Sequence, residues 1–217
     1  MKILILQNRM GIGDMIMFLP FIEAISKKFK TPVTILAKKN TKVEMYFNNK
    51  EIVEEIMYLE REDNKKHSGV KGFFKLVNEL KLKKFDKVFI FNSSLRYFLI
   101  SKFSGIKEVF HYPLFKKKNQ QIIEAAKEFT LKSIGEDIES TPRLFLKEQD
   151  ILKARKDHSI EQSTTNVILG IGGSGKTKRV PASIFKSFMS KVLKRSNCRF
   201  FLMTGNNIDE LKIMDEI

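Results

Sequence analysis

Short apolar runs alternate with longer amphipathic segments along most of the chain. The runs lie at residues 3–6, 33–37, 56–59, 88–91 and 108–111. Runs of this length are typical of buried strands, and the segments between them carry apolar residues at helical spacing, such as Phe73, Val77 and Leu80. Strands and helices in alternation predict βαβ units. We therefore expect an α/β fold with a mostly parallel sheet that is covered by helices on both faces.

The pattern weakens over residues 135–165 and restarts at Asn166. The weak region is polar, with one short helix expected near residues 149–158. The restart gives a strand at 167–169, a glycine-rich turn, a helix, a strand at 200–203 and a last helix that begins near Ile208. We expect one Rossmann-like domain over residues 1–160 and the beginning of a second over residues 161–217.

The second region is small for a domain of this class. About 50 residues with two strands fall short of a doubly wound domain, whose typical size is roughly 100–150 residues. The region is either truncated or docked onto the first sheet, and we favour truncation.

The chain is strongly basic, with 40 Lys and Arg against 25 Asp and Glu and a net charge of +15. This charge favours anionic partners. However, 32 of the 40 basic residues are lysine, whereas bidentate recognition of phosphates and bases favours arginine. We therefore expect no nucleic acid as a partner and favour peripheral contact with an anionic membrane surface.

Other residue types limit the possible sites. The single cysteine, Cys198, permits no internal disulfide, and no apolar stretch approaches the roughly 18 residues of a membrane span. We expect a cytoplasmic protein that can bind peripherally at the inner face of the cytoplasmic membrane. The three histidines are scattered, so we expect neither a metal site nor a cofactor.

Residues 168–181, ILGIGGSGKTKRVP, contain the Walker A pattern of P-loop NTPases at Gly170, Gly175, Lys176 and Thr177. In a P-loop the helix begins at the Lys-Thr pair, and its first amides hold the phosphates. Here Pro181 would lie in the second turn of that helix, where proline costs about 3 kcal/mol. We therefore expect the helix to begin at Pro181 and the residues before it to form a different kind of phosphate site.

Three segments, taken in order, resemble glycosyltransferase family 9, the bacterial heptosyltransferases of lipopolysaccharide core assembly. The segments are MKILILQNRMGIGDMIMFLPFIEAISKKF, FDKVFIFNSSLRYFLISKFSGIKEVFHY and GGSGKTKRVP. The resemblance implies a GT-B fold, with the acceptor mainly on the N-terminal domain and the nucleotide-sugar on the C-terminal one. The chain departs from the family at residues 7–10, at Val180, where tryptophan is usual, and in ending before the later donor-binding part. The last departure puts the activity of this chain in question.

The resemblance assigns a catalytic role to Asp14, which lies beside Gly11 and Gly13 in the family's Gly-Asp turn. Asp14 matches the general base that takes a proton from the acceptor hydroxyl. Without the resemblance, the sequence predicts that Asp14 is a helix N-cap, because aspartate is among the residues most common at that position.

The resemblance also implies binding roles. Lys178 matches the lysine that binds the donor diphosphate, and Ser174, next to Gly173, matches a hydroxyl that contacts the donor phosphates. Asn92 and Arg96 would hold phosphates of the acceptor. By composition alone, Lys178 is a solvated lysine beside two other cations.

Together these residues imply an inverting, metal-independent glycosyltransferase. It would move a heptose-like sugar from a nucleoside-diphosphate sugar to an anionic glycolipid or oligosaccharide of the lipopolysaccharide-core type. Two alternatives remain open. One is a P-loop NTPase or kinase that uses residues 170–177, and the other is a non-catalytic, basic binding module.

Overall fold

The computed structural model describes all residues except 10, 48–49, 115–119, 145, 162 and 174–175. The chain divides into two compact units, Met1–Phe145 and Leu146–Ile217. The division precedes the boundary expected near residue 160, and it places the helix α6 (Glu148–Asp157) in the second unit. The Arg199 guanidinium of β7 donates to the carbonyl of Ser159, at 2.7 Å, and so joins the segment directly after α6 to the second unit.

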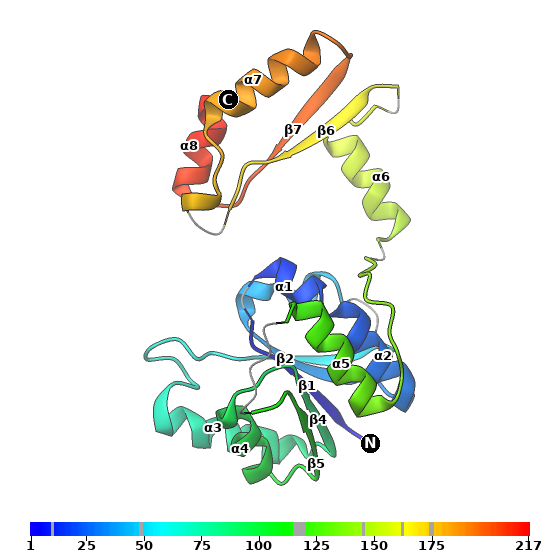
Figure 1. Cartoon of the computed structure of the whole chain (residues 1–217), viewed down its shortest axis with the longest axis vertical. Coiled ribbons are helices and arrows are strands. Elements are labelled where there is room, and N and C mark those ends of the chain that lie inside the picture. Colours follow the sequence, from blue (N-terminus) through cyan, green and yellow to red (C-terminus); the bar gives the residue numbers. More distant parts are fainter. Residues whose placement is uncertain (10, 48–49, 115–119, 145, 162, 174–175) are drawn as a thin grey trace. The chain divides into compact units, whose positions relative to one another are not determined.

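The first unit alternates strands and helices as the apolar runs predict (Figure 1). Its strands are β1 (Ile3–Gln7), β2 (Val33–Ala37), β3 (Val53–Tyr58), β4 (Lys87–Ile90) and β5 (Glu108–His111). Its α-helices are α1 (Ile12–Ile16), α2 (Leu19–Phe29), α3 (Gly69–Lys83), α4 (Leu95–Phe103) and α5 (Ile122–Ile134). All strand pairs are parallel, in the order β3-β2-β1-β4-β5.

Strand β1 lies in the middle of this sheet and is apolar on both faces. Ile3 and Ile5 belong to the core under α2 and α5, whereas Leu4 and Leu6 belong to the core under α3 and α4. All four side chains are fully buried, and burial of one such side chain stabilises a fold by about 1.5–3 kcal/mol. The uninterrupted apolar run is thus explained by burial on both faces.

Strand β3 begins three residues earlier than the sequence predicts. Glu54 and Glu55 interrupt its apolar pattern, but β3 is an edge strand and both carboxylates find partners. Thr34 donates to Glu54 at 3.2 Å, and Lys83 of α3 pairs with Glu55 at 2.5 Å. An edge strand tolerates charges that would exclude a central strand.

The second unit repeats the βα pattern with its own two-stranded parallel sheet. Its elements after α6 are β6 (Thr165–Gly170), a 3₁₀ turn at Lys176–Lys178, α7 (Ala182–Leu193), β7 (Cys198–Met203) and α8 (Ile208–Glu216). Among the described residues, β6 and β7 pair with each other and not with the first sheet. The alternative to truncation, in which these strands extend the first sheet, is therefore not found among the described residues.

Helix α7 begins close to where the sequence places it. Pro181 has φ −60° and ψ 147° and is the N-cap, so the first helical residue is Ala182 rather than the proline itself. The 3₁₀ turn ends at Lys178, and no helix continues from Lys176 through Pro181. The continuous helix that a P-loop requires is absent from this described stretch.

The start of α3 packs closely against the segment before it. His67 is buried, its Nδ1 accepts from the Glu60 amide at 3.0 Å, and its Nε2 lies 3.2 Å from Glu79. A Cβ added to Gly72 would lie 2.2 Å from the His67 carbonyl carbon. Glycine at this position thus allows the helix to approach the backbone of His67.

We expect Gly72→Ala to destabilise the first unit by about 1–3 kcal/mol, because the added methyl group overlaps backbone atoms that cannot move aside. Gly13→Ala is the matched control, since a Cβ there meets nothing within 4 Å and alanine favours helix by up to about 1 kcal/mol. Thermal unfolding followed by circular dichroism measures both. Equal stability of the two variants would contradict the close packing at Gly72.

Candidate functional site

The loops after β1 and β4 meet at the point where the strand order reverses. The chain leaves β3 at one edge and returns as β4 on the other side of β1. In open α/β sheets, ligands bind at the carboxyl ends of the strands at such a point. Here the Asn92 amide, after β4, donates to Asn8 Oδ1, after β1, at 2.8 Å. This hydrogen bond joins the two loops that the sequence analysis selected.

Asp14 lies in the first turn of α1, in the loop region after β1. The N-cap of α1 is Gly11, whose φ of 104° favours glycine, so Asp14 is not the N-cap. The Asp14 side chain is partly exposed and makes no hydrogen bond or ion pair with the described residues. Asp14 is therefore not the N-cap that the sequence also allowed. Its carboxylate is available to a ligand.

Asn92 and Arg96 both make structural contacts within the unit. Besides its bond to Asn8, Asn92 accepts from the Ser94 amide at 2.7 Å, just before α4. The Arg96 guanidinium donates to the carbonyls of His67 and Gly69 at 3.0 and 2.9 Å. These contacts use part of the hydrogen-bonding capacity of both side chains, and their roles toward an acceptor stay predictions.

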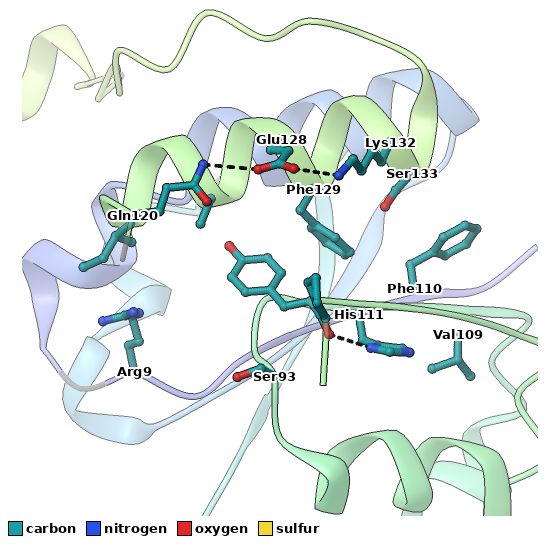
Figure 2. A pocket seen from close by; sticks show the side chains of 14 residues that line it. Arg9, Ser93, Val109, Phe110, His111, Gln120, Glu128, Phe129, Lys132 and Ser133 are labelled. Atoms are coloured by element: carbon teal, nitrogen blue, oxygen red, sulfur yellow. Dashed lines mark hydrogen bonds and ion pairs between the residues drawn. The ribbon is translucent and has the colours of Figure 1, made fainter. Parts of the chain in front are cut away.

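A pocket of about 530 Å³ lies at the same edge of the sheet (Figure 2). It extends from the carboxyl ends of β1, β4 and β5 along α5. Aromatic and polar side chains share its lining, among them Arg9, Ser93, His111, Tyr112, Phe129 and Lys132. The sequence analysis selected neighbours of Arg9 and Ser93 but neither residue itself.

Some polar groups of this pocket have hydrogen-bond partners within the protein, and others have none among the described residues. Glu128 accepts from Gln120 at 3.2 Å and from Lys132 at 2.6 Å, so the Lys132 ammonium is paired within α5 (Figure 2). The Tyr112 hydroxyl is buried without a hydrogen-bond partner in the described part of the chain. Burial raises the pKa of Tyr112 despite the nearby Arg9 cation, so the phenol keeps its proton at neutral pH.

In the second unit the glycine-rich loop folds back on itself. A Cβ on Gly173 would lie 3.1 Å from the Lys178 carbonyl oxygen and 3.2 Å from the Lys178 Cβ. Gly173 and Lys178, which the resemblance selected together, are thus in contact, and Lys178 is exposed just before α7. Ser174 lies outside the described residues.

The Gly173 amide N–H forms a hydrogen bond within the protein. It donates to Glu210 Oε1 at 3.1 Å, and the Gly205 amide donates to the other carboxylate oxygen at 3.0 Å. These two bonds hold the pKa of Glu210 below its usual value, with the Gly205 bond the larger cause. Gly173 therefore shapes the loop, and its own N–H points to a carboxylate rather than to a ligand.

Glu210 is not among the residues that the sequence pattern predicts for the site. A local signal exists, because a glutamate at the third helical position often reaches back to the backbone before its helix. Its contact with Gly173 spans 37 residues, and no periodicity indicates a bond of that range.

The described residues contain no group of three or more His, Cys, Asp and Glu side chains arranged to hold a metal ion. None of the helices they form is long and apolar enough to cross a membrane.

The sequence matches no protein-family model and no curated protein. Solved structures do match. A glycosyltransferase family 9 protein from Veillonella parvula aligns with 99% of this chain at a TM-score of 0.70 and 15% identity. ADP-heptose heptosyltransferase II from E. coli aligns with 100% at a TM-score of 0.64, also at 15% identity. E. coli heptosyltransferase WaaC, solved with ADP, aligns with 98% at 0.63 and 15% identity.

The chain spans 65%, 67% and 70% of the length of these three proteins. The alignments include both units of the chain. The likeness of fold therefore covers the five-stranded parallel sheet of the first unit and the βα pattern of the second. A shared fold can host many activities, and an activity has to be derived from the site residues. The chain has the α/β, GT-B-like fold of these family 9 and heptosyltransferase structures.

Proposed function

We propose that this chain carries the acceptor-side and donor-side elements of an inverting glycosyltransferase. It would move a heptose-like sugar from a nucleoside-diphosphate sugar to an anionic glycolipid or oligosaccharide of the lipopolysaccharide-core type. The observation that carries this proposal is the Asp14 carboxylate, which has no partner among the described residues and lies where the strand order of the sheet reverses. The chain that contains this sheet has the fold of heptosyltransferase structures. The net charge of +15 suits work beside an anionic lipid surface.

Asp14 would act as the general base. As it takes the proton of the acceptor hydroxyl, the oxygen attacks the anomeric carbon from the face opposite the leaving group. The bond between that carbon and the diphosphate oxygen breaks, and the diphosphate leaves with the electron pair. This displacement inverts the anomeric centre, and a base placed in line supplies its proton acceptor.

Lys178 would stabilise the departing diphosphate. It precedes α7 by a few residues, and the positive end of that helix carries amide N–H groups without intrahelical partners. A lysine beside such amides can bind a diphosphate without a metal ion. The structure of WaaC with ADP supports a nucleoside diphosphate as the ligand class.

The pocket in the first unit would take part of the acceptor. Arg9 is an exposed cation at its rim, and the Tyr112 hydroxyl can donate to a sugar or phosphate oxygen. The aromatic lining suits the apolar face of a sugar ring. Arg9 replaces Arg96 in this assignment, since Arg96 is bound to backbone carbonyls.

We expect Asp14→Asn to lower the turnover of sugar transfer by about 10²–10⁴-fold, the usual contribution of a general base. The amide is isosteric but cannot accept the proton. The measurement is transfer from an ADP-sugar to a lipopolysaccharide-core acceptor, with calorimetric titration of ADP as the control for donor binding, which should not change.

Two outcomes would contradict the assignment of Asp14. Near-normal turnover of Asp14→Asn with a lower melting temperature would make Asp14 a structural residue. ADP binding without any transfer by the unaltered chain would favour the non-catalytic binding module.

We expect Lys178→Ala to weaken ADP binding about ten- to a hundredfold, since a charge-assisted contact contributes roughly 1.5–3 kcal/mol. Lys176→Ala, two residues further from α7, serves as the control and should have a much smaller effect. Calorimetry with and without EDTA measures both variants. The reverse ranking, or a strict requirement for Mg²⁺, would revive the P-loop alternative.

We expect Arg9→Ala to raise the KM for a phosphorylated acceptor about tenfold while ADP affinity stays unchanged. Lys132→Ala, at the other end of the pocket, is the control, because Lys132 is already paired with Glu128 at 2.6 Å. A larger effect at Lys132 than at Arg9 would move the acceptor's anionic group to the α5 side of the pocket.

A further inference from the structure

Glu210 is the charged member of a very small buried set in the second unit. Among the described residues from 146 onward, four are buried, and they are Ile171, Ala182, Cys198 and Glu210. Burial of a carboxylate is unfavourable unless hydrogen bonds and charges compensate it. The surroundings of Glu210 provide both.

The carboxylate joins the loops that follow the two strands of this unit. Gly173 follows β6, and Gly205 follows β7; each donates its amide to one oxygen of Glu210, at 3.1 and 3.0 Å. The Thr204 hydroxyl donates to the second oxygen at 3.3 Å. A single side chain from the first turn of α8 thus fixes both loops at the same end of the sheet.

Lys178 is connected to Glu210 by two routes. On one side, the Gly173 that Glu210 binds lies against the Lys178 backbone, where a Cβ would approach to 3.1 Å. On the other side, Arg179 pairs with Asp209 at 2.7 Å and lies 3.9 Å from Glu210. The backbone at Lys178 is therefore held from both directions by the first turn of α8.

We infer that Glu210 is a positioning residue for donor binding: its carboxylate holds the glycine-rich loop so that Lys178 can meet the diphosphate. This inference rests on the proposed function. The inference also explains why glycine suits position 172. A Cβ on Gly172 would lie 2.8 Å from Glu210 Oε2 and displace the carboxylate. The bound amides and Arg179 offset the charge of Glu210, so it does not repel the ligand.

The test uses two variants that disturb Glu210 in different ways, each with a matched control. Glu210→Gln keeps the shape and removes the charge, and Glu216→Gln makes the same change at an exposed site on the same helix. Gly172→Ala introduces the collision, whereas Gly170→Ala adds a Cβ that meets nothing within 4 Å. Circular dichroism identifies any variant that fails to fold.

We expect Glu210→Gln and Gly172→Ala to weaken ADP binding about three- to tenfold by calorimetry, and the two controls to leave it unchanged. In the Lys178→Ala background, Glu210→Gln should cause little further loss, because a residue that acts through Lys178 has no effect once that side chain is gone. Amide hydrogen exchange should show faster exchange at Gly173 and Gly205 in Glu210→Gln.

The outcomes separate the two proposals. If the unaltered chain binds neither ADP nor UDP, the proposed function fails. If it binds ADP and loses affinity in Lys178→Ala but not in folded Glu210→Gln, the positioning role of Glu210 alone fails. Additive losses in the double variant would also overturn that role, since they would show that Glu210 acts independently of Lys178.

Discussion

Burial of β1 on both faces is the constraint on which the first unit depends. Its side chains alternate between two cores, so the strand can lie only in the middle of the sheet with helices above and below. The strand order reverses between β1 and β4, and Asp14 follows the carboxyl end of β1 within the first turn of α1. The place of the proposed base is thus a consequence of where apolar side chains had to be buried.

The second unit is organised differently. Few of its described side chains are buried, and one of them is the Glu210 carboxylate. Hydrogen bonds to charged groups are directional and stronger than those between neutral groups. Such contacts define the shape of a ligand loop better than apolar packing does, since apolar packing has no preferred direction.

Much of the fold could be predicted from the sequence, because burial on both faces leaves a visible apolar run. The bounds of β2 and β5 agree with the runs at 33–37 and 108–111. The start of β3 did not agree, since an edge strand can hold Glu54 and Glu55. The rejection of a P-loop helix followed largely from Pro181, and only the assignment of that proline changed, from first helical residue to N-cap.

The candidate site residues differ in how far the sequence points to them. Asp14, Gly173 and Lys178 lie within short stretches that carry local patterns, and their roles stay predictions. Arg96 and Glu210 depend on partners 27 to 37 residues away, and nothing in a linear pattern reveals that Arg96 is already bound or that Glu210 accepts from Gly173. Side chains whose partners come from other elements require coordinates.

Exposed apolar side chains on the second unit have a consequence for this stretch of chain in solution. Ile168, Ile184, Phe188 and Met203 expose between 45% and 64% of their surface. At low ionic strength, a net charge of +15 keeps copies of the chain apart. Added salt shortens the range of that repulsion to about 10 Å at 0.1 M, after which exposed apolar side chains can meet. Colloidal stability should therefore fall with salt, the opposite of the salting-in shown by many proteins of balanced charge.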